Sequence, residues 1–368
     1  MVSAFVPRSV FPKLESIPRT YFLGHHKAGL EKMKSMLSSV DHIIEVRDFR
    51  IPSTSINPML EDALGEKSRY IVYMKRDLGG DLRLQAQKNE KVIARWDRKS
   101  RVFFIAKANK NLNKHRLPPF KRLLRGDQFN CNPVTGVRIL VVGMPNIGKS
   151  TLINLLRSEC MKKRGTAVVG ADPGVTRKVG GAVKIMQKKN GSIYLHDTPG
   201  VFVPYMPDAE SMLRLALCGQ VKDSIIPATT LADYLLYKIN LHNPHIYHKY
   251  CPPTNEIIDF LEQMARKSGL LGRGAVPDIE RAARRFIIQW RDGEMGKFIL
   301  DDIHARTLER KQEYLASLGG SMNQAKRAEK AEKRATTRRE INALRAHFNT
   351  HGLDCPPPGM ISDRGPLP

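Results

Sequence analysis

Short apolar runs, each ending where a polar or glycine-rich turn begins, recur along the first part of the chain. Their length and their spacing are typical of buried strands that alternate with helices. The pattern predicts strands at His42–Val46, Tyr70–Tyr73, Val102–Ala106, Val137–Val142 and Ser192–His196. Because such strands build a parallel sheet covered on both faces, we expect an α/β domain from about Val40 to Val203. Ligands of such a sheet bind beyond the carboxyl ends of its strands.

The pattern changes to helical periodicity after residue 204. One stripe consists of Ile257, Phe260, Leu261 and Met264, and a second consists of Ile279, Ala282, Ala283, Phe286, Ile287 and Trp290. We therefore expect a domain at residues 21–204 and a smaller all-helical domain at residues 205–325. Residues 326–350 are rich in Lys and Arg and predict a basic helix or arm, with RNA contact and a solvated helix face as alternatives. Residues 351–368, rich in Pro and Gly, are expected to form a disordered tail.

The composition adds a strong positive charge to this picture. The chain has 61 Lys and Arg against 36 Asp and Glu, a formal net charge of +25. A polyanionic partner is expected, with nucleic acid the better fit and an anionic membrane surface the alternative. No apolar run approaches the ~18 residues that a membrane-spanning helix needs. The cysteines show no C-x-x-C spacing, so neither a metal cluster nor a disulfide framework is expected.

The first 20 residues are basic and apolar and contain a single acid, Glu15. This composition is typical of a mitochondrial transit segment. An unstructured basic N-terminus without a targeting role is the alternative.

A phosphate-binding loop follows the strand expected at Val137–Val142. Residues 143–150, G-M-P-N-I-G-K-S, match G-x-x-x-x-G-K-[ST] and precede a helical sequence. Successive N–H groups and the helix N-terminus supply positive potential, Lys149 is expected to bridge β- and γ-phosphate oxygens, and Ser150 to bind magnesium. The nucleotide is expected to contact Asn146, Ile147, Gly148, Lys149, Ser150 and Thr151.

Two downstream segments complete the expected phosphate site. Residues 197–200, D-T-P-G, close the strand Ser192–His196, where P-loop enzymes place an acid for magnesium and a glycine whose N–H meets the γ-phosphate. Asp197 and Gly200 are expected in these roles. Between this segment and the P-loop, residues 172–176 predict a mobile turn from which Thr176 completes the magnesium coordination. Lys149, Thr176 and Gly200 are the candidate catalytic groups of these motifs.

Base recognition is expected upstream of the P-loop. Residues 74–77, M-K-R-D, follow the strand Tyr70–Tyr73 and resemble the N-K-x-D signature of GTPases. A carboxylate such as Asp77 can accept the N1 and N2 hydrogens of guanine, and the stem of Lys75 can lie along the ring. Ala106 and Lys107 resemble the S-A-K loop of GTPases, in which a backbone N–H donates to guanine O6. The serine of that loop is absent here. Met74 in place of asparagine predicts weakened guanine affinity.

The order of these motifs is a circular permutation of the usual GTPase order, and the chain resembles the YlqF-type ribosome-assembly GTPases. Residues 21–27, Y-F-L-G-H-H-K, are similar to the family's F-P-G-H-M-x-K. Residues 41–52, D-H-I-I-E-V-R-D-F-R-I-P, look like its D-x-x-I-E-V-x-D-A-R-x-P segment, and residues 291–297 like a short C-terminal signature. The basic surplus and the transit-like start point to the family's mitochondrial members.

The resemblance implies a P-loop GTPase fold with permuted motifs, followed by the helical domain, that hydrolyses GTP to GDP with Mg²⁺. Its implied partner is the mitochondrial large ribosomal subunit with its rRNA. The GTP-bound protein is expected to bind this subunit and to dissociate from it after hydrolysis. The implied location is the mitochondrial matrix, with peripheral association to the inner membrane. A monomer is expected when the protein is free.

Hydrolysis without a partner is expected to be slow, because Val201 stands where many GTPases have a water-orienting glutamine. The resemblance implies two substitutes, a potassium ion bound with help from Asn146 and the side chain of His25 near the water. A histidine that packs or binds RNA is the alternative for His25.

Three other functions remain open at this point. A P-loop ATPase or kinase is disfavoured by Asp77, and a nonenzymatic RNA-binding scaffold with a degenerate GTP site is disfavoured by the intact Lys149, Ser150 and Asp197. A peripheral membrane protein is compatible with ribosome binding.

Overall fold

The computed structural model describes most of the chain up to residue 317, with gaps. The described residues are 5–12, 17–18, 24–65, 67, 69–80, 83–97, 99–106, 118–126, 129, 135–161, 181–189, 191–202, 206 and 208–317. The predicted basic arm at 326–350 and the tail at 351–368 lie outside them. The chain divides into two units, Met1–Arg310 and Lys311–Pro368. The site below lies in the first unit, and the last described helix extends into the second.

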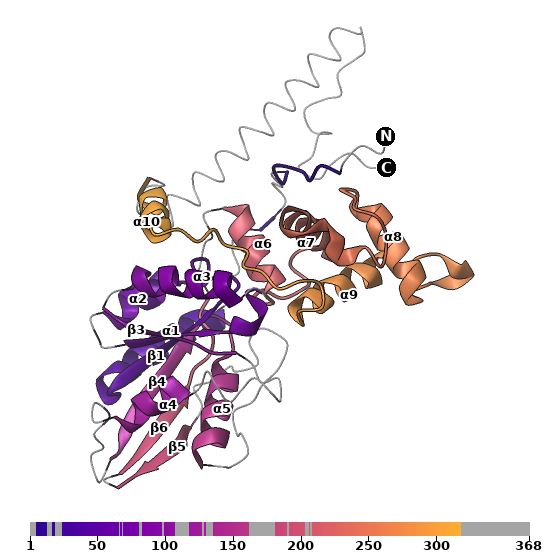
Figure 1. Ribbon diagram of the computed structural model, residues 1–368. Coiled ribbons are helices and arrows are strands. Elements are labelled where there is room, and N and C mark those ends of the chain that lie inside the picture. The colour runs from indigo at the N-terminus through magenta and orange to yellow at the C-terminus, as the bar shows by residue number, and fades with distance from the viewer. Residues whose placement is uncertain are drawn as a thin grey trace, which may run out of the picture. The chain divides into compact units, whose positions relative to one another are not determined.

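The described strands form one six-stranded sheet in the order β3-β2-β1-β4-β6-β5 (Figure 1). The strands are β1 His42–Asp48, β2 Arg69–Met74, β3 Arg101–Phe104, β4 Val137–Gly143, β5 Ala182–Lys188 and β6 Gly191–Asp197. Neighbours are parallel except β5, which runs antiparallel to β6. The five predicted strands are confirmed with small shifts of their ends, and the predicted α/β class with them.

The sequence pattern predicts a parallel sheet and does not predict strand β5, which is antiparallel to β6. It is an edge strand in which only Ile185 and Met186 are buried. A register irregularity between Lys184 and Met186 interrupts its pairing with β6. Such a bulge breaks the in–out alternation, so two consecutive apolar residues face inward and the period-two signal is lost.

The order of the strands explains how a permuted chain builds one site. The chain lays down β1, β2 and β3 in one direction across the sheet, then places β4 on the other side of β1 and continues to β6 and β5. The direction therefore reverses between β1 and β4, and ligands of parallel sheets bind at such a reversal beyond the strand carboxyl ends. The P-loop follows β4 at this point.

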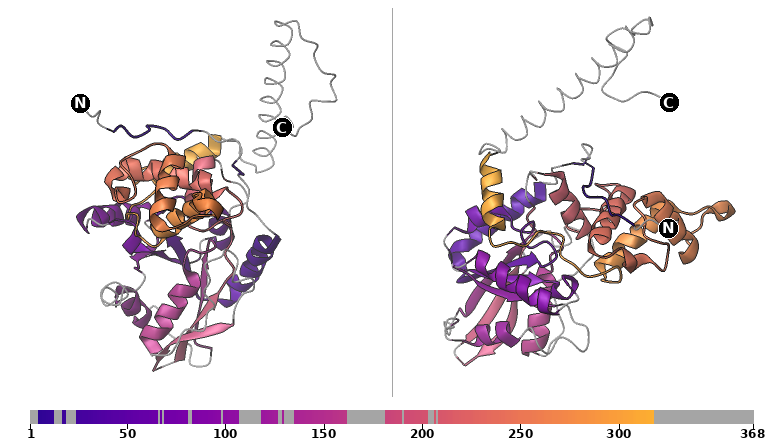
Figure 2. Two further views of the ribbon diagram at one scale, coloured as in Figure 1. Left: turned by 90° about the vertical axis from the view of Figure 1, so that its right-hand side faces the viewer. Right: turned by 45° about the horizontal axis from the view of Figure 1, so that its top comes forward.

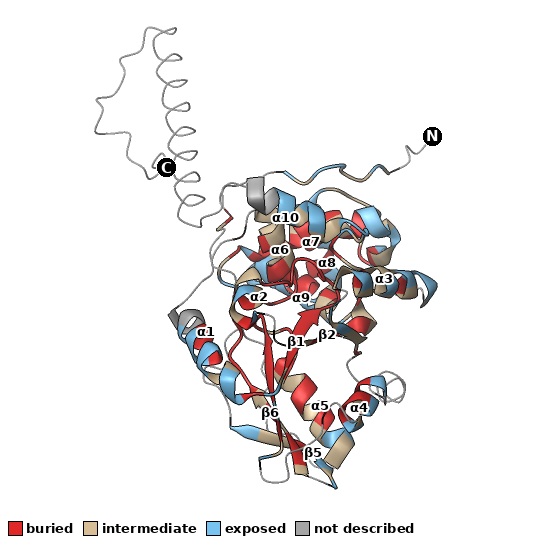
Figure 3. Cartoon of the chain, turned by 90° about the vertical axis from the view of Figure 1, so that its left-hand side faces the viewer, coloured by how far each residue is buried: buried red, intermediate tan, exposed pale blue. Residues whose placement is uncertain are grey.

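Helices flank the sheet and then continue beyond it. The first group is α1 Gly24–Met36, α2 Pro58–Leu64, α3 Arg83–Trp96, α4 Pro118–Arg125 and α5 Lys149–Met161, and short 3-10 helices are η1 Leu37–Ser39, η2 Arg76–Leu78, η4 Pro244–Tyr247 and η5 Arg273–Ala275. Figure 3 shows the sheet as mostly buried, whereas exposed residues face outward on the helices. The sequence defines some helix ends directly: Asn57 caps α2 by accepting from the Met59 N–H, and Pro58 stands at its first position.

The second group of helices follows β6. It consists of α6 Ala209–Leu217, α7 Ala228–His242, α8 Ile257–Ser268, α9 Ile279–Arg291 and α10 Thr307–Ser317. Asp208 and Asp278 cap α6 and α9, and Gly269, with a φ of 67°, ends α8. Both predicted stripes face inward, since Phe260, Leu261 and Met264 are buried on α8 and Phe286 and Trp290 are buried on α9.

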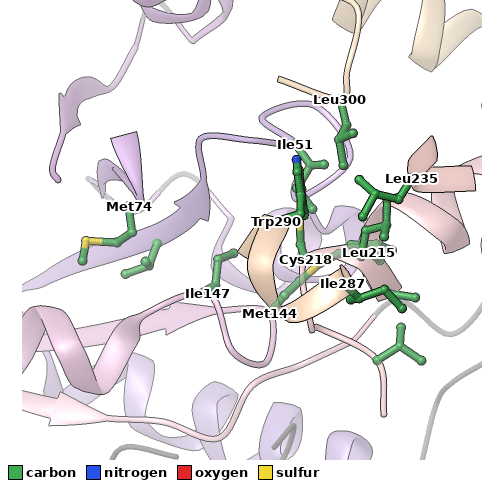
Figure 4. Close-up of a cluster of buried hydrophobic side chains, with 14 of the residues drawn as sticks. Ile51, Met74, Met144, Ile147, Leu215, Cys218, Leu235, Ile287, Trp290 and Leu300 are labelled. Atoms are coloured by element: carbon green, nitrogen blue, oxygen red, sulfur yellow. The ribbon is translucent and has the colours of Figure 1, made fainter. Parts of the chain in front are cut away.

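The apolar core continues from the sheet into this helical part. Met144 and Ile147 of the P-loop belong to the same buried cluster as Leu215 of α6 and Trp290 of α9. Figure 4 shows these side chains converging between the two parts. The phosphate-binding loop therefore rests directly on the helices that follow it in sequence.

Candidate functional site

The P-loop requires glycine where it leaves β4. Gly143 has a φ of 147°, and a Cβ there would lie 2.5 Å from the carbonyl oxygen of Val46 on the neighbouring strand. Gly148 has a φ of 110°, and Asn146 is also left-handed, at 51°. These left-handed residues let the loop curl back before α5, as a cradle for phosphate needs. Ile147 is fully buried and anchors the loop in the main apolar cluster.

Lys149 begins α5 and is almost fully buried, with 6% of its surface exposed. Its Nζ donates to the carbonyl oxygens of Gly143, at 3.4 Å, and Met144, at 2.8 Å, within the loop itself. Burial lowers the pKa of this amine to about 8, and the nearby Asp197 carboxylate opposes that shift. The cation is thus held in the centre of the loop, where the β- and γ-phosphates of a nucleotide would lie.

Ser150 and Asp197, the two described residues predicted to bind magnesium, lie side by side. The Ser150 hydroxyl donates to Asp197 Oδ2 at 2.6 Å, so β6 and the start of α5 bring the two side chains together. Within the described residues, the second carboxylate oxygen, Oδ1, is buried and accepts no hydrogen bond. A hard cation prefers such oxygen ligands, so the pair could hold Mg²⁺, which would supply positive charge to stabilise the phosphates. Burial raises the pKa of the Asp197 carboxyl, while Ser150 and Lys149 lower it.

The segment after Asp197 is pressed against the P-loop. A Cβ at Gly200 would lie 2.4 Å from the Pro145 backbone nitrogen, so residue 200 must be glycine for this approach. The Thr198 hydroxyl donates to the Val141 carbonyl at 2.6 Å, and the Val201 N–H donates to the Gly143 carbonyl at 3.2 Å. A conformational change of the P-loop would therefore displace this segment as well.

Val201 packs in an apolar cluster between α1 and the sheet. Its side chain is fully buried in an apolar cluster with Leu30 and Met33 of α1 and Leu140 and Val142 of β4. The structure thus gives position 201 a packing role. This agrees with the sequence-based expectation that residue 201 cannot orient a water molecule.

Lys75 joins the base-recognition loop to the P-loop. It has a left-handed backbone, with a φ of 59°, and its Nζ donates to the Asn146 carbonyl at 3.0 Å. The same Nζ donates to Asp48 Oδ2 at 2.9 Å. Asp48 ends β1 and is fully buried, and it also accepts from the backbone and guanidinium of Arg50. The lysine stem is therefore fixed from both sides.

Sequence reasoning did not identify Asp48 as part of the site. The signal was present, because Asp48 lies in the family-like segment at residues 41–52 and follows a buried strand. Burial raises the pKa of this carboxyl, but Arg50 and Lys75 lower it more, so that the net shift is far below the ordinary range. Asp48 therefore stays ionised beside the two cations.

Met74 supports the P-loop by packing. It is 1% exposed, and a Cβ placed on Gly148 would lie 3.4 Å from both its Cβ and its Cγ. Figure 4 shows Met74 in the buried cluster that also contains Ile147. An apolar contact thus stands where the GTPase signature has a polar asparagine. The predicted weakening of guanine affinity stays a prediction.

Asp77 and Ala106 lie at the same edge of the sheet. Asp77 is half-buried in η2, and Ala106 follows β3. The backbones of the two loops are linked, because the Arg76 N–H donates to the Ile105 carbonyl at 3.1 Å. This link places the two predicted guanine-binding segments next to each other.

Three predicted residues are not placed as functional side chains. Thr176 and Lys107 lie outside the described residues. His25 lies in the first turn of α1, and the position of its side chain is likewise outside the described part. Thr151 is in α5, half-buried, directly after Ser150. In the described ranges no cluster of three or more His, Cys, Asp or Glu residues that could hold a metal ion occurs.

The carboxyl end of α6 receives contacts from the P-loop, from the loop after β1 and from α9. Asn146 Nδ2 donates to the Gly219 carbonyl at 2.8 Å, and Arg50 donates to the Cys218 carbonyl at 3.3 Å. From α9, Arg291 donates to the Leu217 and Ala216 carbonyls, each at 2.8 Å. Such donors satisfy the carbonyls that the end of a helix leaves without partners. We call residues 216–219 the α6 terminus.

Comparison with known proteins agrees with this geometry. Residues 138–270 match the family model described as 50S ribosome-binding GTPase. Mitochondrial GTPase 1 of Schizosaccharomyces pombe is 35% identical over 320 residues, which cover 83% of this chain and 95% of that protein. Mitochondrial ribosome-associated GTPase 1 of Mus musculus is 35% identical over 311 residues, or 80% of this chain and 93% of the mouse protein.

Among solved structures, the chain is similar to GNP-bound YlqF from T. maritima, with 24% identity, a TM-score of 0.49 and coverage of 74% of this chain and 97% of that one. No helix in the described ranges combines the length and the apolar character needed to cross a membrane. Most of the P-loop, Ser150 and Asp197 lie within the residues that match the family model. The chain is a circularly permuted P-loop GTPase and belongs to the mitochondrial GTPase 1 family.

Proposed function

We propose that this GTPase is an assembly factor for the mitochondrial large ribosomal subunit, which it binds at an rRNA-rich surface in the GTP state and leaves after hydrolysis. The observation that carries the proposal is the 35% identity to a relative named mitochondrial ribosome-associated GTPase 1. The net charge of +25 supports an RNA partner, because cationic surfaces bind phosphate backbones.

The site geometry supports GTP rather than ATP as the bound nucleotide. Lys75 is fixed between Asp48 and the P-loop, and Asp77 follows it at the edge of the sheet where the base would lie. The carboxylate of Asp77 accepts the N1 and N2 hydrogens of guanine in this proposal, and adenine offers no such pair. Asp197 and Ser150 hold Mg²⁺.

The buried Val201 supports catalysis by groups other than residue 201. In our proposal the ribosome-bound enzyme uses a potassium ion held with help from Asn146, and His25 near the attacking water. The Asn146 amide is oriented by its bond to Gly219. Helix α1 packs beside the D-T-P-G segment, since a Cβ at Gly29 would lie 3.5 Å from the Pro199 Cβ. His25 stands one helical turn before Gly29, and Thr176 completes the magnesium shell.

The deciding experiment measures GTP hydrolysis in potassium and in sodium, each with and without isolated mitochondrial large subunits. Strong stimulation that requires both the subunit and potassium is expected. Stimulation by subunits that is equal in the two salts would remove potassium from the proposal. GTP binding without turnover in any condition would favour an RNA-binding scaffold, against which the assembled Lys149, Ser150 and Asp197 stand.

His25 is tested separately. The His25→Ala variant is expected to lose subunit-stimulated turnover while its affinity for GTP stays unchanged, because Gly29 of α1 lies against Pro199 of the D-T-P-G segment. Unchanged stimulated turnover would exclude His25 from catalysis.

We further propose that the protein acts as a monomer in the mitochondrial matrix and associates peripherally with the inner membrane. The names of the relatives and the positive charge support this location. Fractionation of mitochondria tests it: release from membranes by high salt is expected for a peripheral protein held by charge. Resistance to salt would contradict an electrostatic attachment.

A further inference from the structure

The segment at residues 5–12 lies along α7, a helix more than 200 residues later in the sequence. Figures 1 and 2 show this indigo segment beside the helices of the second group. Its contacts come from Asp233, Tyr234 and Tyr237 of α7 and from Asn255 in the loop before α8. We call these four residues the α7 groove.

Arg8 is the charged anchor of the segment. Its two terminal nitrogens donate to the two carboxylate oxygens of Asp233, one of them at 3.3 Å. The side chains are only 24% and 21% exposed. A bidentate pair of this kind is directional and stronger than a single contact between exposed charges.

Asn255 and Tyr237 hold the backbone on either side of Arg8. The Arg8 N–H donates to Asn255 Oδ1 at 3.3 Å, and Asn255 Nδ2 donates to the Val6 carbonyl at 3.0 Å. The Tyr237 hydroxyl donates to the Ser9 carbonyl at 3.3 Å. The side-chain amide of Asn255 thus pairs with an extended backbone as a neighbouring strand would.

Phe11 is the apolar anchor. Its ring meets Tyr234 edge-on, with 5.2 Å between centroids, and lies 5.6 Å from Tyr237. Phe11 packs against the main buried cluster, and Tyr234 is itself fixed by a hydrogen bond to Glu210 at 2.9 Å. By contrast, Val6 and Val10 are each 74% exposed. Within the segment, the side chains of Arg8 and Phe11 therefore face the α7 groove, whereas those of Val6 and Val10 face solvent.

We propose that residues 5–12 are a permanent strap of the mature protein, held in the α7 groove of the same chain, and are not removed with an import signal. Any cleavage of a signal in this region then falls before Phe5. The strap fixes the start of the polypeptide to the helical part, and α1, a short distance further along the chain, packs on the D-T-P-G segment.

Trypsin tests the docking on the full chain, because cleavage after Arg8 requires the strap to leave the groove. The Asp233→Ala and Asn255→Ala variants are expected to be cut after Arg8 about tenfold faster than the wild type or more, since cleavage follows the population of the open state. Val10→Ala is the matched control and should be cut at the wild-type rate. The peptide that ends at Arg8 is quantified by mass spectrometry.

Two results would overturn the docking. One is wild-type cleavage after Arg8 as fast as in the two groove variants. The other is protection that disappears on dilution, which would indicate a segment exchanged between two copies. Circular dichroism of each variant checks that the helices remain folded, so a general loss of structure is distinguished from release of the strap.

Retention of the strap is tested by measuring the intact mass of the protein isolated from mitochondria. This experiment rests on the proposed location. A mature chain that includes residues 5–12 is expected. A mature N-terminus at Val6 or later would refute retention, whereas the protease result stands independently of where the protein acts.

Discussion

Lys149 carries a pH dependence that its burial dictates. Its pKa of about 8 is set by desolvation, and the phosphates of a bound nucleotide would raise it again. Binding above pH 8 must therefore take up a proton, so affinity falls as the pH rises. We expect GDP to bind about tenfold more weakly at pH 9 than at pH 7.

Titration with a fluorescent GDP analogue at several pH values between these limits measures the effect. The Lys149→Met variant is the control and should bind weakly without this slope. Wild-type affinity that is constant up to pH 9 would contradict the lowered pKa.

Asp48 should influence affinity without influencing the choice of base. The Asp48→Asn variant removes the charge that holds Lys75 and is expected to weaken GDP binding about tenfold, the effect of losing a charge-assisted hydrogen bond. Because Asp77 is the group that selects guanine in our proposal, the ratio of GDP to IDP affinity should stay the same. Calorimetry measures both affinities.

Asp97→Asn provides a matched control, since Asp97 pairs with Arg69 away from the base loop. A changed GDP to IDP ratio in the Asp48 variant would mean that Asp48 itself contacts the base. Equal affinities in wild type and Asp48→Asn would show that Asn146 alone positions Lys75.

At the level of elements, the packing between α1 and the sheet determines what residue 201 can do. Val201 lies in the cluster formed with Leu30 and Met33. A glutamine there would bury an amide among apolar groups, at a cost of about 1–3 kcal/mol. We expect Val201→Gln to lower the thermal midpoint and to leave the intrinsic rate of GTP hydrolysis unchanged.

Val201→Thr, similar in shape with a smaller polar group, should show a smaller loss of stability. Single-turnover hydrolysis and thermal melting are measured on both variants. A large gain in hydrolysis by Val201→Gln would show that residue 201 can reach the water.

The α6 terminus is the element through which the nucleotide site and the helices are joined. Its carbonyls accept from Asn146 of the P-loop, from Arg50 after β1 and from Arg291 of α9. Arg50 also lies over the Trp290 ring, with its guanidinium carbon 5.1 Å from the centroid. These contacts offer a direct route from P-loop to helices, because a shift of either loop must change the partners of α6.

At the scale of the whole described unit, the chain returns to the sheet after α9. Asp301, whose side chain is fully buried, accepts hydrogen bonds from the N–H and hydroxyl groups of Ser53 and Thr54 and pairs with Arg214 at 3.2 Å. Asp301→Ala would leave these donors buried without their acceptor. We expect the free energy of unfolding to fall by about 3–5 kcal/mol.

Denaturant unfolding measures this loss. The Asp302→Ala variant is the control, because Asp302 is the next residue and its carboxylate is exposed. Similar stabilities for the two variants would show that the return segment contributes little to holding the helices on the sheet.

In the proposed function, the net charge of +25 should govern the encounter with the large ribosomal subunit. Release of counterions from RNA makes such binding steeply dependent on salt. Co-sedimentation with large subunits is expected to fall by orders of magnitude between about 50 and 200 mM salt. Binding that is insensitive to salt would contradict an interface dominated by RNA phosphates.

The sequence alone determined the strands that carry the motifs, the α/β class, the P-loop, the D-T-P-G segment and the permuted order. These features depend on local patterns: a buried parallel strand is a continuous apolar run, and a phosphate loop is a short motif between a strand and a helix. Strand β5 could not be predicted, because its bulge breaks the alternation of apolar and polar residues.

Only the tertiary structure decided what lies next to these motifs. It placed Asp48 beside Lys75, Met74 beneath Gly148, Val201 in an apolar cluster, and Arg8 on Asp233. Each of these contacts joins residues distant in sequence, and the pairing depends on the order of strands in the sheet and on the path of the chain around it. Local patterns contain no record of that path, so such contacts emerge only when the chain has folded.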